Sequence, residues 1–293
     1  DLWAKIKGIT VVGTGDFTHP KWLNELEEKL IPAGNGLFRL KEKYIDKNYF
    51  FHKKPTYFML SSEISTIYKK NDKVRKIHSI IFAPDFESVK KIQAKLSKIG
   101  NINADGRPIL GLDAKNLLEI ILEVNSECFL VPAHIWTPWF SVLGSKSGFN
   151  SIYECFEDLT KYIFAVETGL SSDPPMNWRC SMLDEFAIIS NSDAHSPENL
   201  GREANIFNCE PSYFLIKDSL KNKDKETFLG TIEFYPQEGK YHYDGHRKCM
   251  IRLAPAQSEE YSNICPVCKK ELTLGVMHRV MELADRQEGE KSK

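Results

Sequence analysis

Several short apolar runs in this chain each end in side chains that can bind a metal ion. Residues 187–189 run into Asp193 and His195, and residues 129–133 run into His134. A short apolar run that ends in this way predicts a buried strand whose last residues lie at the carboxyl edge of a sheet. Because the strands of one α/β sheet share that edge, the sequence predicts one shared metal site rather than scattered ligands.

The candidate metal ligands are carboxylates and imidazoles, which suit catalytic zinc, manganese, iron or magnesium better than a closed structural site. Two or three such ions can hydrolyse a phosphate ester, because they activate a water and neutralise the leaving oxygen. The candidates are Asp16, His19, Glu63, His78, His134, Glu167, Asp193 and His195. Taken singly, each has a structural explanation: His78 could be a hydrogen-bonded core histidine, and Asp16 could cap a helix. Those expected to act directly in catalysis are Asp16, Glu63, Asp193 and His195.

Length and composition are those of an ordinary globular chain. The 293 residues allow one large barrel or two domains, and the hydrophobic content of 42% can fill a sizeable core. The net charge of −1 excludes a globally basic nucleic-acid-binding protein, so a polyanion would have to meet a local patch or bound metals. No apolar run approaches the roughly 20 residues of a membrane span, and the N-terminus lacks a signal-peptide pattern. We therefore expect a cytoplasmic protein without a membrane partner.

Strands alternate with helices along most of the chain, which predicts a parallel α/β barrel or an open sheet. Strands are expected at residues 9–13, 57–60, 76–82, 129–133, 162–166, 187–189 and 203–207. Helices are expected at residues 21–30, 86–99, 114–124 and 152–159, and at residues 2–7 before Gly8. A lysine- and aspartate-rich stretch begins at Lys217. We expect residues 1–216 to form the barrel, 217–230 a linker, and 231–293 a zinc module with the start of a further region.

The seven cysteines fall into two groups. Cys128, Cys155, Cys180 and Cys209 are scattered, and we expect free and mostly buried thiols. The other group forms a His-x2-Cys pair and, after fifteen residues, a Cys-x2-Cys pair, a spacing in the zinc-ribbon range. The expected ligands are His246, Cys249, Cys265 and Cys268, with His242 and His278 as alternatives to His246. Four protein ligands leave no open coordination position, so a structural zinc is expected.

Aromatic and basic residues occupy the loops at the predicted site edge. They could stack on bases or contact phosphates of DNA. These residues are Arg107, Trp136, Trp139, Phe140, Lys146, Trp178 and Arg179. The alternative is that the aromatic rings cover the barrel and that the cations are general surface residues.

At this point the motifs resemble those of a known group of enzymes. The series Thr14-Gly15-Asp16, Glu63, His78, His134, Glu167 and Ser192-Asp193-Ala194-His195 resembles the PHP (polymerase and histidinol phosphatase) superfamily of metal-dependent phosphoesterases. Residues 13–22, 103–110, 132–149, 167–179, 191–205 and 239–249 resemble the endonuclease Q family more closely. The resemblance implies a distorted (β/α)7 PHP-type barrel followed by a zinc module. It also implies nicking of DNA 5′ of deaminated bases (uracil, hypoxanthine, xanthine) or abasic sites, and repair or replication proteins as partners.

The resemblance also implies how the candidate ligands divide among the metal ions. Glu63 would bridge two ions, with Asp193 beside the first. His78 and His134 would bind the second ion, and His195 would bind a third. These roles are carried over by position in the motif series.

The sequence departs from the family pattern at three points. The family's first motif, a His-x-His strand, is absent, and so is the helical region expected after the zinc module. Superfamily members usually have adjacent Asp and His residues, whereas Asp16 and His19 are separated here, so either could be the ligand. We therefore expect a fragment or an incomplete enzyme, with weakened metal binding and little activity. The rival interpretations are a small-molecule phosphoesterase and a catalytically incomplete DNA-binding fragment.

Overall fold

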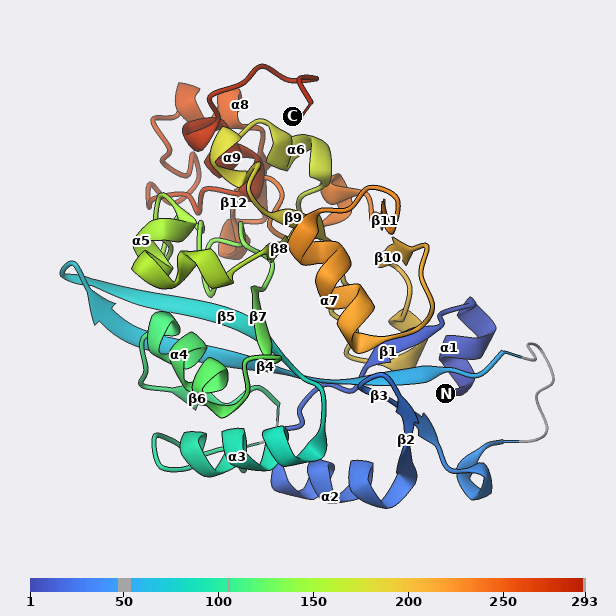
Figure 1. Ribbon diagram of the computed structural model, residues 1–293. Coiled ribbons are helices and arrows are strands. Elements are labelled where there is room, and N and C mark those ends of the chain that lie inside the picture. The colour runs from blue at the N-terminus through green and yellow to red at the C-terminus, as the bar shows by residue number, and fades with distance from the viewer. Residues whose placement is uncertain (47–53, 105, 292–293) are drawn as a thin grey trace.

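The computed structural model describes residues 1–46, 54–104 and 106–291 of a mixed α/β protein (Figure 1). The main sheet has seven strands in the order β2-β3-β4-β5-β7, and β1 and β6 each pair with β4. Its strands are β1 (Val11–Gly13), β2 (Leu30–Gly34), β3 (Leu37–Leu40), β4 (Tyr57–Lys70), β5 (Lys73–Ala83), β6 (Ile109–Leu110) and β7 (Phe129–Pro132). Three separate pairs join β8 (Ala165–Glu167) to β9 (Ala187–Ile189), β10 (Ala204–Phe207) to β11 (Phe228–Ile232), and β12 (Asp244–His246) to β13 (Ile251–Leu253).

The helices lie between these strands along the chain. The α-helices are α1 (Leu2–Lys7), α2 (Pro20–Lys29), α3 (Phe86–Leu96), α4 (Ala114–Val124), α5 (Ile152–Phe156), α6 (Pro174–Trp178), α7 (Tyr213–Asn222), α8 (Pro255–Glu260) and α9 (Val276–Leu283). The 3-10 helices are η1 (Glu42–Tyr44), η2 (Glu157–Tyr162), η3 (Ser181–Leu183), η4 (Pro197–Asn199), η5 (Pro236–Glu238) and η6 (Arg247–Cys249). None of the helices in the described ranges has the length and apolar character needed to span a lipid bilayer.

The main sheet is mixed, whereas the sequence predicted a parallel barrel or a parallel open sheet. The pairs β1–β4, β4–β6 and β8–β9 are parallel, but β4–β5 and β5–β7 are antiparallel. The reason is a hairpin turn at Asn71 and Asp72, which have φ of 52° and 58°. Two consecutive positive φ values form the type I′ turn that suits the twist of a hairpin, and Asn and Asp tolerate them. The strand pairs of the described residues therefore do not form a closed parallel barrel.

Helices lie on both sides of the main sheet (Figure 1). In Figure 1, α2 and α3 lie on one side of the long β4–β5 ribbon and α7 lies on the other. The N-cap Asp85 of α3 accepts a hydrogen bond from the Ser88 amide at 2.7 Å, which satisfies a free donor of the first turn. From α3, Ile92 is fully buried in one core cluster with Ile77 and Ile81 of β5. This packing fixes the strand that carries His78.

The stretch predicted as a linker is folded. Residues 217–230 belong largely to α7 and β11, and β11 pairs antiparallel with β10. Tyr213, at the start of α7, is fully buried, and its hydroxyl donates to the Glu127 carbonyl at 2.8 Å. Lys217 is 8% exposed, and its Nζ lies 3.0 Å from the Glu127 carboxylate. Composition suggested a linker because residues 217–227 contain a single apolar residue, Leu220, among lysines and acidic residues.

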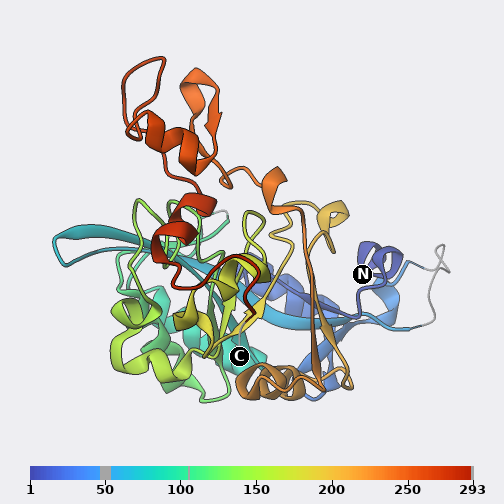
Figure 2. The same ribbon diagram turned by 90° about the horizontal axis from the view of Figure 1, so that it is seen from above.

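The cysteine- and histidine-containing segment projects from the remainder of the chain. Figure 2 shows β12, β13 and α8 extending away from the main sheet. Its return segment, α9, packs on the main body, where the Arg279 Nε donates to the Leu143 carbonyl at 2.9 Å. At the base of the segment, His278 Nδ1 lies 2.6 Å from the carboxylate of the fully buried Asp244. These contacts connect β12 to α9 and α9 to the loop that contains Leu143.

The scattered cysteines are free thiols. Cys128, Cys155 and Cys180 are buried, and Cys209 is half-buried. The expectation of free thiols is confirmed for all four residues.

Glu203 is a buried carboxyl beside the β10–β11 pair. It is 2% exposed, and neither of its carboxyl oxygens has a hydrogen-bond partner among the described residues. Burial, together with the neighbouring carboxyls of Glu233 and Glu167, raises the pKa of Glu203 to about 9. The folded chain therefore holds this group neutral near pH 7.

A pH series on Glu203→Gln tests this environment. A carboxyl with a higher pKa in the folded than in the unfolded chain stabilises the fold below its unfolded value of 4.5, and this contribution is lost as pH rises toward about 9. The free energy of unfolding of the wild type, relative to Glu203→Gln, should fall by at least about 1 kcal/mol between pH 5 and pH 9. Urea denaturation measures it, with the exposed Glu119→Gln as control. A difference that does not change with pH would contradict the prediction.

Candidate active site

The register of β4 and β5 brings two of the candidate ligands together. Glu63 pairs with Ile80 and Ser65 pairs with His78, so Glu63 and His78 are diagonal neighbours on one face of the hairpin. Glu63 lies inside β4, whereas the sequence predicted that a strand would end there. Its Oε1 is 3.0 Å from His78 Nδ1.

His134 reaches the same place from the end of β7. The Ala133 amide donates to the His78 carbonyl at 3.1 Å, which continues the β5–β7 pairing up to His134. His134 has a positive φ of 29°, and a Cβ at Gly169 would lie 2.4 Å from the His134 Cβ. Only glycine leaves room for the imidazole at that contact. His134 Nδ1 is also 3.0 Å from the Thr137 hydroxyl, which orients the ring.

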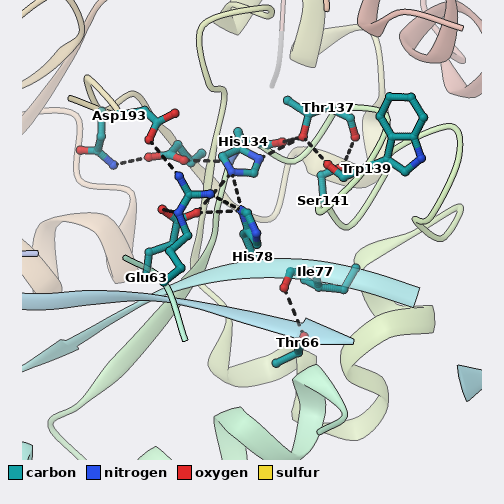
Figure 3. Close-up of polar contacts among 12 residues, drawn as sticks. Glu63, Thr66, Ile77, His78, His134, Thr137, Trp139, Ser141 and Asp193 are labelled. Carbon is teal, nitrogen blue, oxygen red and sulfur yellow. Dashed lines mark hydrogen bonds and ion pairs between the residues drawn. The ribbon is translucent and has the colours of Figure 1, made fainter. Parts of the chain in front are cut away.

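The three side chains form a compact triangle of ligand atoms (Figure 3). Besides the Glu63–His78 contact, His134 Nε2 lies 3.3 Å from Glu63 Oε1 and 3.2 Å from His78 Nδ1. Ligand atoms bound tetrahedrally to one zinc-sized ion are about 3.4 Å apart, so these separations suit a shared ion. Glu63, His78 and His134 can therefore hold a metal ion.

Hydrogen bonding alone does not account for these contacts. Arg107 Nη1 is 3.0 Å from His78 Nδ1, and because a guanidinium only donates, this contact needs a lone pair on Nδ1. The contact of the same Nδ1 with Glu63 Oε1 needs a proton on it instead. No protonation state of His78 satisfies both contacts. A divalent cation that displaced Arg107 from His78 would instead use the lone pairs of Glu63 and His78.

Arg107 brings positive charge to this cluster of ligands. Its Nε is 2.8 Å from Glu63 Oε2, and its Nη2 is 3.7 Å from Asp193 Oδ1. The guanidinium therefore connects the ligand triangle to Asp193. Asp105, in the loop before Arg107, lies outside the described residues.

Charge and burial shift the pKa values of the three side chains of the triangle. Burial opposes ionisation of Glu63, but hydrogen bonds from His134 and His78 outweigh it and hold the Glu63 pKa well below its usual value. Burial lowers the pKa of His78. Burial also lowers the pKa of His134. The hydrogen bond to Glu63 and the charge of Glu63 outweigh burial, so the pKa of His134 is raised. The site thus stabilises an ionised Glu63, which is the form that binds a cation.

Glu167 supports His134 and does not join the triangle. One of its oxygens accepts the His134 amide at 2.7 Å, and the other accepts the Asn191 side-chain amide at 2.7 Å. Glu167 is 3% exposed, and burial raises its pKa to about 7. We did not single out Asn191 or Thr137 from the sequence, although Asn191 lies in the Ser-Asn-Ser-Asp string before His195. Nothing in their spacing distinguished them from ordinary loop residues.

The remaining candidate ligands lie around the triangle. Asp193 has a φ of 43°, and its carbonyl accepts from His195 Nδ1 at 3.0 Å, while His195 is largely exposed. Burial, followed by the charge of Glu63, raises the pKa of Asp16, and the charge of His19 lowers it. The structure thus groups only part of the predicted set by direct contact.

The predicted zinc ligands form a second group. His246, Cys249, Cys265 and Cys268 offer ligand atoms within 4.8 Å of one another and could hold a metal ion. His246 Nδ1 lies 3.5 Å from Cys268 Sγ. The two alternatives have other partners: His242 Nδ1 is 2.9 Å from the Ser171 carbonyl, and His278 pairs with Asp244. The geometry therefore selects His246 as the fourth member.

The predicted DNA-contacting aromatic residues lie in different environments. Trp136 is 1% exposed and donates from Nε1 to Asn177 Oδ1 at 2.8 Å, so its prediction as a DNA contact is wrong. The Phe140 ring packs against His78 at an interplanar angle of 34°, with ring centroids 4.6 Å apart, and Trp178 is half-buried in α6. Trp139 is 39% exposed, and in Figure 3 its ring lies beyond Thr137 and is directed away from the triangle.

The predicted basic DNA contacts also differ in their partners. Arg107 lies in the triangle's own charge network. Lys146 Nζ is 3.5 Å from the exposed Glu271. Arg179 is half-buried, and its carbonyl accepts the amides of Asp285 and Arg286.

Comparison with known proteins identifies the family. No protein-family model matches the sequence. The chain is 31% identical to the uncharacterized protein YqxK of Bacillus subtilis over 285 residues, which is 96% of this chain and 68% of YqxK. It is 35% identical to the uncharacterized protein MJ0043 of Methanocaldococcus jannaschii over 158 residues, 51% of this chain and 19% of that protein.

Two solved structures share the fold over the whole chain. One is the lesion-specific endonuclease PfuEndoQ from Pyrococcus furiosus, with a TM-score of 0.79, 28% identity, and coverage of 100% of this chain and 67% of that one. The other is Endonuclease Q in complex with a 27-mer duplex substrate with an abasic lesion at the active site, with a TM-score of 0.81, 28% identity, and coverage of 100% and 68%. Together with the motif series and the ligand triangle, these matches show that the chain belongs to the endonuclease Q family of DNA-repair endonucleases.

Proposed function

We propose that this protein is a metal-dependent endonuclease of the PHP type that nicks DNA 5′ of a deaminated base or an abasic site. The triangle of Glu63, His78 and His134 carries the proposal, because its interatomic distances suit a metal ion and no protonation state of His78 satisfies both of its contacts. The duplex with an abasic lesion bound by the Endonuclease Q relative supports DNA as the substrate. A target base in a duplex must leave the stack, which costs least at a damaged or missing base.

Each residue of the site would have a distinct role in the proposed reaction. Glu63, His78 and His134 would hold one divalent ion, and Asp193, with Asp16, His19 or His195, would hold others beside it. When bound, such ions lower the pKa of a water and stabilise the charge on phosphate oxygens. Glu167 keeps His134 in place through its backbone amide. Arg107, which already faces Glu63 and Asp193, would donate to a phosphate oxygen.

Asp193→Asn tests the proposed reaction. The substitution keeps the shape of the side chain but removes a carboxylate charge, and loss of a ligand should lower the nicking rate at least about 100-fold, since loss of supporting residues alone costs 10- to 100-fold. Affinity for lesion DNA should remain, because the cations and aromatic rings at the site are unchanged. Gel assays with duplexes containing uracil, hypoxanthine, xanthine or an abasic site measure nicking.

The matched control is Asp72→Asn, at the exposed hairpin turn. It should nick like the wild type. Equal nicking by Asp193→Asn would refute the proposed role. Hydrolysis of a free phosphomonoester without nicking of any lesion duplex would instead favour the small-molecule phosphoesterase.

Trp139→Ala tests recognition of the lesion. Trp139 is an exposed aromatic residue of the loop that follows His134, and a base stacked on such a ring contributes about 1–3 kcal/mol. The variant should bind lesion DNA roughly 5- to 150-fold more weakly and unfold at the same denaturant concentration. Tyr153→Ala, which removes an exposed ring from α5, serves as the control. Unchanged binding by folded Trp139→Ala would count against stacking by this residue.

We also propose that the second cluster holds a structural zinc. Its one histidine and three cysteines fill a tetrahedral coordination sphere. Cys265→Ser should reduce the zinc content by about one ion per chain and increase amide hydrogen exchange in residues 244–275. Elemental analysis and exchange mass spectrometry measure both, and Cys209→Ser is the control outside the cluster. Full zinc content in Cys265→Ser would contradict the assignment.

A further inference from the structure

The loop that carries Asp193 is bonded to the segment at the start of β10. The Asn205 side chain binds both backbone groups of Ser190, since Oδ1 accepts from the Ser190 amide and Nδ2 donates to its carbonyl, each at 3.0 Å. The Ser192 hydroxyl donates to the Glu203 carbonyl at 2.8 Å. Because β10 is itself anchored by its pairing with β11, these bonds fix the backbone that leads from β9 to Asp193.

Arg202 extends these contacts to Asp193 itself. Its Nε donates to the Ser192 carbonyl at 2.7 Å, and its Nη2 donates to the Asp193 carbonyl at 3.1 Å. The N–H groups of a guanidinium form a rigid planar fork, so one arginine can bind both carbonyls only while residues 192 and 193 keep one relative orientation. Arg202 therefore fixes the two peptide groups on either side of the Asp193 Cα.

The backbone conformation of Asp193 needs such support. Its φ of 43° lies in the left-handed region, which residues with a Cβ rarely adopt. Its side chain is 38% exposed, so packing around the carboxylate does not enforce this conformation. His195 Nδ1 also contacts the Asp193 carbonyl, but His195 belongs to the same exposed loop. Among the described residues, the bond from Arg202 is therefore the hydrogen bond that ties the Asp193 backbone to the remainder of the fold.

The backbone of Asp193 determines where its carboxylate lies. Asp193 Oδ1 is 3.7 Å from Arg107 Nη2, and Arg107 Nε is 2.8 Å from Glu63 Oε2, so the carboxylate faces the ligand triangle. A change of φ rotates the Cα–Cβ bond relative to the preceding chain. Relaxation of Asp193 to the common negative range of φ would therefore direct its carboxylate elsewhere.

We propose that Arg202 is a positioning residue for metal binding, because it holds the Asp193 backbone so that this carboxylate can serve an ion beside the triangle. The inference rests on the proposed function, in which Asp193 is a ligand. Arg202 is not a ligand itself, since it donates to carbonyls of the loop. Loss of a residue that orients a metal ligand lowers metal affinity about 10- to 100-fold.

Titration of the protein with Mn²⁺ in the absence of DNA tests this role. Electron paramagnetic resonance of the free ion measures binding, and Asp193→Asn identifies the ion that depends on this carboxylate. Arg202→Met should weaken the binding of that ion about 10- to 100-fold. Electrostatics alone predicts the opposite change, because removal of a positive charge near a cation site strengthens metal binding. Equal or tighter binding by Arg202→Met would overturn the proposal.

Arg202→Lys separates the fork from the charge. Lysine keeps the positive charge but cannot hold two carbonyls in a fixed plane. It should weaken the same ion by half as much on a logarithmic scale, about 3- to 10-fold. Binding equal to that of the wild type would overturn the proposal, and this variant decides the question if Arg202→Met does not fold.

A double-mutant cycle shows whether Arg202 acts through Asp193. In the Asp193→Asn background, Arg202→Met should change the remaining Mn²⁺ affinity less than about twofold, because the carboxylate that it positions is already lost. An equal fall in both backgrounds would overturn the proposal. Arg39→Met, at an exposed arginine of β3, is the control and should bind Mn²⁺ like the wild type.

The two levels of inference separate in these experiments. If Asp193→Asn weakens Mn²⁺ binding and Arg202→Met does not, the role of Arg202 falls alone. If Asp193→Asn leaves Mn²⁺ binding unchanged, Asp193 is not a ligand and both assignments fall. If the wild type nicks no lesion duplex although Mn²⁺ binding depends on both residues, the proposed function falls and the positioning role of Arg202 stands.

Discussion

The register between β4 and β5 is the constraint on which the active site depends. Because side chains alternate along a strand, a slip of one residue would turn Glu63 or His78 to the opposite face and separate the ligand atoms. The hairpin turn at Asn71 and Asp72 fixes this register, and the fully buried Ile77 and Ile81 anchor β5 in the core. Hydrophobic packing thus determines where the carboxylate and the imidazole meet, and the polar contacts refine their distances.

Backbone strain is concentrated around the same cluster. Asp16, His134 and Asp193 all have positive φ, between 29° and 46°, a region that side chains other than glycine rarely adopt. Such conformations cost about 1–3 kcal/mol each and persist only where neighbouring contacts enforce them. At His134 the enforcing contact is the bond from its amide to Glu167, and the glycine at 169 leaves the necessary space. The fold therefore holds the residues that follow β1, β7 and β9 in backbone conformations that the same segments would not keep in isolation.

The sequence predicted the chemistry of the site better than the arrangement of the strands. Glu63, His78 and His134 were all named as ligands, because each follows or lies in an apolar run and has a metal-binding side chain. The antiparallel β4–β5 hairpin was missed, since the period-two pattern of residues 57–70 does not show where a strand ends when both faces are buried. The burial of Trp136 was missed for a related reason: its partner Asn177 is 41 residues away and no local pattern connects them.

The position of Arg107 has a consequence for how the centre is assembled. Its guanidinium and a divalent ion would use the same lone pair on His78 and the same carboxylate of Glu63. An ion that enters must therefore exchange with this side chain, and one positive charge replaces another beside two acidic groups. Either cation would compensate the negative charges of Glu63 and Asp193. When an ion displaces Arg107 from Glu63 and His78, the guanidinium also becomes free to donate hydrogen bonds to a phosphodiester.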